Sequence, residues 1–211
     1  MSAPLAFCAL SVAALLGAKA RGEHALAGVA KMLAAAAFLW FALAGGALAT
    51  PPGCFVLAGL ALCALGDVLL IPSGAGRAFL AGMGAFGLGH AAYAGAALLL
   101  GISLPALTIG ALLLAPVLAR TWRWLAPNLP RAMRAPVAAY TAIVGAMALL
   151  TCAASANGAS PWLAAGGVAF AISDLSVARE RFIAPRFVNV AWGLPLYFAA
   201  QLAIGASVAI R

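Results

Sequence analysis

The chain has 211 residues, of which 66% are hydrophobic and 8% are charged. A soluble domain carries about 25% charged residues, and 12 basic plus 4 acidic side chains cannot coat a soluble protein of this size. The composition excludes a disordered chain, a disulfide scaffold and a soluble nucleotide-binding fold. We therefore expect an all-α, polytopic membrane protein whose outer surface faces lipid.

Proline, glycine and arginine divide the sequence into eight apolar stretches, each close to the length of about 17–25 residues that crosses a bilayer as a helix. The connections between them are short, so the sequence predicts one integral-membrane helical bundle over residues 1–211. The first stretch is expected to be a retained helix rather than a signal peptide, because its positive charges follow the apolar run. In chain order the expected helices are Pro4–Ala18, Gly28–Leu48, Gly53–Ile71, Arg77–Leu100, Ile102–Ala119, Arg134–Ser155, Ser160–Ala178 and Phe187–Ile210.

Basic residues gather in the loops that follow the odd-numbered stretches. Arg211 alone lies at the opposite face, and Lys31 lies within a span. The positive-inside rule then places the basic loops in the cytoplasm and both termini outside it, in a multi-pass protein of the bacterial inner membrane. This topology explains the net charge of +8, so we expect anionic lipid headgroups and no nucleic acid as partners. The residues concerned are Lys19, Arg21, Arg77, Arg120, Arg123, Arg131, Arg134, Arg179, Arg181 and Arg186.

Four ionisable residues lie inside the expected spans, where a charge costs about 2.5–3.5 kcal/mol: Lys31, Asp67, His90 and Asp174. Each aspartate is expected about four residues before the cytoplasmic end of its helix, so the two carboxyl groups should lie at similar depth. Two carboxyl groups in one cavity supply the acid and the base that hydrolases use. The alternative is structural: each aspartate bonds a neighbouring helix or pairs with Lys31 or an arginine.

Other polar residues follow helical spacing. Phe86, His90 and Tyr93 share one face of the fourth stretch, and the last stretch carries a polar residue or glycine every four positions from Asn189 to Gln201. Such stripes serve either as helix–helix contacts or as ligand sites. The four cysteines, Cys8, Cys54, Cys63 and Cys152, lack metal-ligand or redox spacing and are interpreted as packing residues. No metal or cofactor is expected. The candidate substrate-binding residues are Lys31, His90, Tyr93, Tyr140, Asn189, Tyr197 and Gln201.

Together these residues resemble the YhhN-like lysoplasmalogenase family of eight-helix membrane proteins. The resemblance covers about residues 28–208, with one departure at Met32, where a proline would follow the lysine. The matching pieces are Lys31, Gly66–Leu70, Phe79–Gly82, Phe86, His90–Tyr93, Tyr140, Ser173–Asp174 followed by Phe182, and Tyr197 with Gln201.

The resemblance implies hydrolysis of the vinyl ether bond of lysoplasmalogens, which releases a fatty aldehyde and a glycerophospho-base. It implies a lysophospholipid substrate and Asp67 and Asp174 as the catalytic pair. The residues are compatible with this chemistry, because vinyl ether hydrolysis needs an acid to protonate the alkene carbon and a second carboxylate as base or stabiliser. Which aspartate is the acid stays open.

Two other classes of function stay open as well. One is a small proton- or solute-coupled transporter, in which the intramembrane charges carry protons or substrate. The other is a lipid-binding membrane protein without turnover. An intramembrane aspartyl protease also needs two aspartates, but Ala64 replaces the first glycine of its Gly-x-Gly-Asp signature, and Ser173 precedes Asp174 where that class has tyrosine.

Overall fold

The computed structural model describes residues 2–71 and 76–209, and within these ranges the regular secondary structure is entirely helical. The all-α fold class is therefore confirmed. Two short 3₁₀ segments, η1 (Ala47–Ala49) and η2 (Ala126–Asn128), accompany the α-helices. These are α1 (Ser2–Arg21), α2 (His24–Ala44), α3 (Pro51–Leu69), α4 (Arg77–Leu99), α5 (Leu104–Leu125), α6 (Arg131–Ala156), α7 (Pro161–Phe182) and α8 (Phe187–Ala206).

Seven helices of the described residues are long and apolar enough to cross a membrane, which makes the chain an integral multi-pass membrane protein. The helix outside this set is α4, because its glycines, His90 and Tyr93 lower its mean hydropathy. With 23 residues α4 is about 35 Å long, and it packs along α3 and α6. Its polar residues face other helices, because both His90 and Tyr93 are fully buried.

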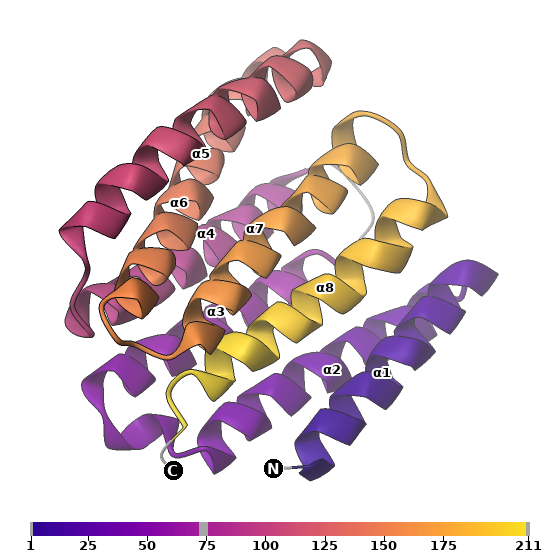
Figure 1. Cartoon of the computed structure of the whole chain (residues 1–211). Coiled ribbons are helices and arrows are strands. Elements are labelled where there is room, and N and C mark those ends of the chain that lie inside the picture. The colour runs from indigo at the N-terminus through magenta and orange to yellow at the C-terminus, as the bar shows by residue number, and fades with distance from the viewer. Residues whose placement is uncertain (1, 72–75, 210–211) are drawn as a thin grey trace.

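Consecutive helices run up and down the bundle, with α1 and α5 at opposite edges (Figure 1). The start of α1 and the end of α8 lie at the same end of the bundle. Phe7 contacts Trp40 near the end of α2, and a Cβ on Gly45 would lie 3.3 Å from Ala209. At the edge, α5 packs chiefly against α6.

Local sequence explains where several helices begin and end. α2 stops at Gly45, and Gly46 follows with φ +83°, a conformation that favours glycine. Two prolines begin α3 after Thr50, whose hydroxyl accepts a hydrogen bond from the Gly53 amide at 3.1 Å. The helix therefore starts two residues earlier than expected.

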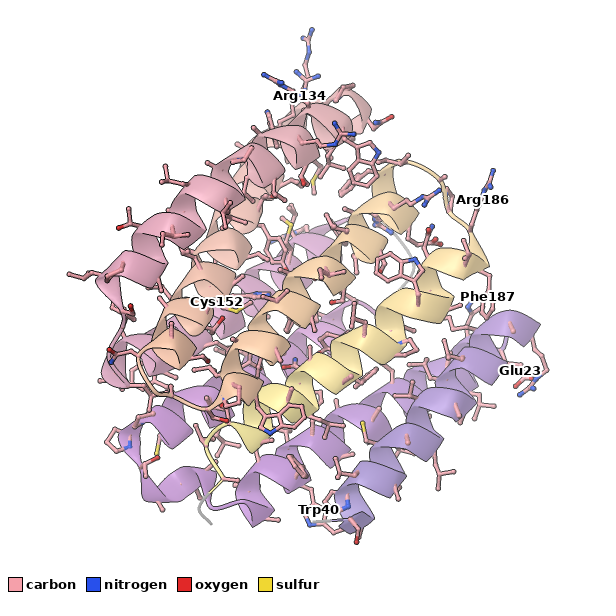
Figure 2. The ribbon with its side chains drawn as sticks, in the orientation of Figure 1. Glu23, Trp40, Arg134, Cys152, Arg186 and Phe187 are labelled. Atoms are coloured by element: carbon pink, nitrogen blue, oxygen red, sulfur yellow. The ribbon has the colours of Figure 1, made fainter. Side chains whose placement is uncertain are left out.

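Most of the basic residues lie near helix ends rather than in loops, which corrects the sequence expectation; Arg186, in the connection before α8, is where it was expected. Arg120 and Arg123 belong to α5, which continues to Leu125 because neither arginine interrupts a helix. Charged side chains such as Arg134, Arg186 and Glu23 extend from one end of the bundle, and Trp40 lies at the other (Figure 2). The expected connection at 72–75 lies outside the described residues.

The cysteines divide into two groups. Cys8 and Cys63 are buried and pack in the core, as expected. Cys54 is exposed, with its Sγ 3.7 Å from the Leu48 carbonyl oxygen, so its interpretation as a packing residue is wrong. Cys152 is partly buried. The position of Cys54 in the first turn of α3 explains its exposure.

Candidate functional site

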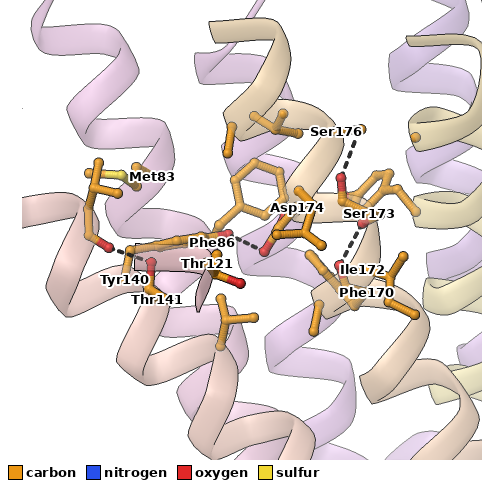
Figure 3. A pocket seen from close by; sticks show the side chains of 18 of the residues that line it. Met83, Phe86, Thr121, Tyr140, Thr141, Phe170, Ile172, Ser173, Asp174 and Ser176 are labelled. Carbon is orange, nitrogen blue, oxygen red and sulfur yellow. Dashed lines mark hydrogen bonds between the residues drawn. The ribbon is translucent and has the colours of Figure 1, made fainter. Parts of the chain in front are cut away.

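A cavity of about 360 Å³ lies between α5, α6 and α7, and its inner wall reaches α2, α3, α4 and α8. Most of its lining is apolar (Figure 3). Ile172 and Leu175 of α7 both line the cavity and are 45% and 37% exposed, so the cavity opens on the lipid-facing side of the bundle. Its principal polar residues are Lys31, Asp67, Tyr140, Asp174 and Tyr197.

Asp67 of α3 is held by two donors from other helices. Its Oδ1 lies 2.9 Å from Nζ of Lys31 on α2, and its Oδ2 accepts a hydrogen bond of 2.7 Å from the Tyr197 hydroxyl on α8. Lys31 Nζ also donates to the backbone carbonyl of Asp67 at 3.4 Å. The side chains of Asp67 and Lys31 are 3% and 15% exposed. A cation and a hydroxyl thus fix this carboxylate in a nearly dry environment.

A chain of hydrogen bonds continues from Tyr197 into the core. Gln201 Nε2 donates to the Tyr197 hydroxyl at 3.1 Å, and the Tyr93 hydroxyl donates to Gln201 Oε1 at 2.6 Å. Both Gln201 and Tyr93 are fully buried. Because each buried polar group has a partner, this chain orients the Tyr197 hydroxyl toward Asp67 and joins α3, α4 and α8.

Asp174 of α7 stands at the cavity wall. The Tyr140 hydroxyl of α6 donates to Asp174 Oδ2 at 3.0 Å (Figure 3), and His90 Nε2 lies 3.8 Å from the same oxygen. The side chain of Asp174 is 19% exposed. Asp174 therefore has a hydroxyl and an imidazole as neighbours, where Asp67 has a lysine and a hydroxyl.

The His90 ring is oriented by its backbone. Nδ1 lies 2.6 Å from the Phe86 carbonyl oxygen, which can only accept, so Nδ1 carries the proton and Nε2 presents a lone pair. Within the described residues Nε2 has no hydrogen-bond partner, and it is fully buried. That lone pair faces the carboxyl group of Asp174.

An aromatic cluster connects the surroundings of the two carboxyl groups. The Phe170 ring centroid lies 4.3 Å from that of His90 and 5.2 Å from that of Tyr197. Phe86 packs edge-on against both Phe170 and Tyr197. These rings form a rigid apolar wall that excludes water from one side of the cavity.

The predicted site residues fall into three groups. Lys31, Asp67, Tyr140, Asp174 and Tyr197 line the cavity. Behind them lie three buried residues: His90 is next to Asp174, and Gln201 and Tyr93 are linked by hydrogen bonds to Tyr197. Asn189 lies elsewhere: its Nδ2 donates to Glu180 Oε2 and to the Ala184 carbonyl, both at 2.8 Å, at the junction of α7 and α8.

The aspartates were expected to meet because each would lie about four residues before the end of its helix. That expectation is wrong. Asp67 lies two residues before the end of α3 at Leu69, and Asp174 lies eight residues before the end of α7 at Phe182. Equal distance from helix ends therefore does not bring them to one cavity. The wall from α5 was also missed, because its apolar residues carry no pattern that separates a cavity lining from a lipid-facing surface. That wall consists of Leu114, Val117, Leu118, Thr121 and Leu125.

Comparison with known proteins gives two matches. The YhhN family matches the chain over residues 24–208. Lysoplasmalogenase TMEM86A of Bos taurus is 34% identical over 179 residues, which cover 80% of this chain and 72% of that protein. No solved structure matches the chain significantly.

Proposed function

The chain belongs to the YhhN family, and from this premise we propose that it is a membrane-embedded hydrolase that cleaves the vinyl ether bond of lysoplasmalogens. The products are a fatty aldehyde and a glycerophospho-base. The observation that carries the proposal is that Asp67 and Asp174 line one apolar cavity that is open on the lipid-facing side. The bovine relative bears the name lysoplasmalogenase, which supports the same substrate class.

The partners of the two carboxyl groups suggest different roles. Lys31 balances a negative charge on Asp67, which suits Asp67 to stabilise a cation and then to accept a proton from water. Asp174, beside the Tyr140 hydroxyl and the His90 lone pair, is assigned as the proton donor. Tyr140 orients the donor, and Lys31 holds the acceptor.

The reaction proceeds in three proton-balanced steps. Asp174 protonates the alkene carbon that is not bonded to oxygen, and the adjacent carbon becomes an oxocarbenium ion. Water attacks that ion as Asp67 accepts one of its protons, and a hemiacetal forms. Asp174 then takes the hemiacetal hydroxyl proton while Asp67 protonates the departing glycerol oxygen, so the carbon–oxygen bond breaks and both carboxyl groups return to their starting states.

The distribution of basic residues also orients the lipid in the proposed site. The basic turns at the ends of α1, α5 and α7 lie at the end of the bundle where Asp67 occurs on α3. A phosphate headgroup binds there by charge, and the apolar chain enters between the helices. In this arrangement the enzyme takes its substrate from the cytoplasmic leaflet of the bacterial inner membrane.

Aldehyde release by the purified protein tests the proposal. With lysoplasmenyl-ethanolamine as substrate, we expect aldehyde from the parent protein and a loss of at least about a hundred-fold in kcat/KM for Asp174→Asn. Asp174→Asn is easier to interpret than Asp67→Asn, because Asp174 bonds a tyrosine hydroxyl, whereas Asp67 pairs with Lys31. Glu23→Gln is the matched control, since this exposed carboxyl group pairs with Arg21 far from the cavity.

Asp67→Asn should also abolish release, and its folding is checked by thermal unfolding because Lys31 loses its ion-pair partner. Full release by both folded variants would contradict the two-carboxylate mechanism. No release by the parent protein would contradict the hydrolase itself. Solute uptake into proteoliposomes would then indicate a transporter, and lipid binding alone a protein without turnover.

A further inference from the structure

The cavity continues well past the carboxyl groups along α6. Its lining on that helix recurs with helical spacing from Val137 through Tyr140 and Val144 to Ala148. From Tyr140, which bonds Asp174, to Ala148 the helix advances about 12 Å. The lining side chains over this length include Leu114 of α5 and are apolar apart from Thr121 and Thr141, which lie near Tyr140 (Figure 3). Water would lack hydrogen-bond partners in this deep part of the cavity.

Close helix contacts end the cavity below this apolar wall. On the contacting helices the lining stops at Leu114 of α5, Ala148 of α6 and Val168 of α7. One turn before Leu114, a Cβ on Gly110 would lie 2.6 Å from Cδ1 of Leu149, so α5 touches α6 there.

The contact between α6 and α7 is equally close at this level. A Cβ on Gly167 would overlap the Thr151 hydroxyl and lie 3.3 Å from Sδ of Met147. Glycine thus allows α7 to approach α6 immediately beside Val168. The two contacts form a floor to the cavity.

We propose that the segment of the cavity between Tyr140 and this floor binds the hydrocarbon chain of a single-chain lipid and limits its length. Assignment of the lipid as a lysoplasmalogen rests on the proposed function. An extended chain advances about 1.25 Å per carbon, so about 12 Å of helix corresponds to roughly ten carbons. Ala148 of α6 and Leu114 of α5 set the limit, because they stand at the floor from opposite walls.

Binding of saturated ether lysophospholipids tests this site without any turnover, because they have no vinyl ether bond. With the protein in amphipol and the ligands below their micelle concentration, each chain is transferred from water, so affinity should rise about four-fold for each added carbon until the chain reaches the floor, and then level off. Ala148→Leu raises the floor by about 2.5 Å. The levelling point should therefore move about two carbons shorter, and affinity for longer chains should fall about ten-fold or more.

Ala146→Leu is the matched control, because Ala146 lies on the same helix, is exposed and faces away from the cavity. Leu114→Ala lowers the floor from the α5 side and should move the levelling point to longer chains. It also keeps the test decisive if Ala148→Leu does not fold. A levelling point that is identical in the parent protein and both floor variants, or that moves equally in Ala146→Leu, would overturn the proposal.

The same variants separate this proposal from the proposed function. A levelling point that moves as expected supports the chain site even if no aldehyde forms, in which case the hydrolase proposal alone fails. Aldehyde release with no chain-length limit supports the hydrolase and overturns the chain site. For an active enzyme, kcat/KM over a series of lysoplasmalogen chain lengths should show the same limit as binding.

Discussion

The ion pair between Lys31 and Asp67 joins two charges that are both largely buried inside the bundle. Two ions in a low-dielectric interior lose their hydration, and their attraction offsets that cost only while both are present. Nζ and Oδ1 are 2.9 Å apart, with both side chains largely withdrawn from solvent.

Lys31→Met is therefore expected to destabilise the protein by about 3–5 kcal/mol, because it leaves the Asp67 carboxylate unpaired. The double variant Lys31→Met/Asp67→Leu should recover most of this loss. Unfolding in a fixed detergent, followed by tryptophan fluorescence, measures both values. A double variant less stable than Lys31→Met would contradict this explanation. It would show that the ion pair stabilises the fold by more than cancelling the cost of two buried charges.

At the residue scale, the sequence predicted the principal polar residues of the cavity lining but not its apolar residues, and it misplaced Asn189. Spacing of four residues places Asn189 and Tyr197 on one helix face, and both are buried. The neighbouring helix decides what each contacts: Tyr197 meets Asp67 of α3, whereas Asn189 meets Glu180 of α7. A periodic pattern identifies a face and contains no information about the partner at each level.

At the scale of elements, a glycine pair sets the separation of α3 and α4. A Cβ on Gly89 would lie 2.7 Å from Sγ of Cys63 and 3.0 Å from the carbonyl oxygen of Gly59. A Cβ on Gly59 would overlap the Tyr93 ring. Small residues thus bring the two helices together at the level where Tyr93 bonds Gln201.

Gly89→Ala should consequently cost about 1–3 kcal/mol, because the added methyl group forces α3 and α4 apart. Gly84→Ala on the same helix is the control: a Cβ there meets open space, and the substitution should be neutral or stabilise by up to about 1 kcal/mol. Thermal unfolding of both variants gives the comparison. Equal stabilities would contradict the close approach of the two backbones.

Helix existence was predictable and helix length was not. The expected spans end at the first charged residue, because hydropathy identifies only the part of a helix that lies in the hydrocarbon core of the bilayer. Helices continue further, since arginine is a good helix former and its long side chain reaches the headgroups. α5 extends six residues beyond the expected Ala119, to Leu125, and α7 extends four beyond Ala178, to Phe182.

At the scale of the whole molecule, the basic residues predict the orientation in the membrane. The first residues of α1 and the last turn of α8 share one end of the bundle (Figure 1), and the arginine-bearing turns occupy the other. The positive-inside rule places the arginine-bearing end in the cytoplasm.

Reporter fusions at the C-terminus should therefore show alkaline phosphatase activity, which requires export, and no fluorescence from a cytoplasm-dependent fluorescent protein. A fusion after Phe182, between α7 and α8, should give the reverse pattern. Fluorescence from the C-terminal fusion would mean that the cavity faces the opposite leaflet.

The shape of the whole cavity could not be predicted from the sequence. Its two aspartates and its lysine were identifiable because charge is rare inside a membrane. Its floor and its α5 wall depend on the simultaneous approach of three helices through Gly110, Gly145 and Gly167. In a chain with 23 glycines, nothing in the sequence marks these three.

The exposed lining of the cavity at Ile172 and Leu175 has a consequence for the fate of the proposed products. A fatty aldehyde is a reactive electrophile, and it leaves most readily through an apolar opening that faces lipid. The glycerophospho-base carries charge and departs toward water at the arginine-bearing end. In the proposed reaction a single cleavage would thus separate its two products, with the aldehyde released into the lipid and the glycerophospho-base into water.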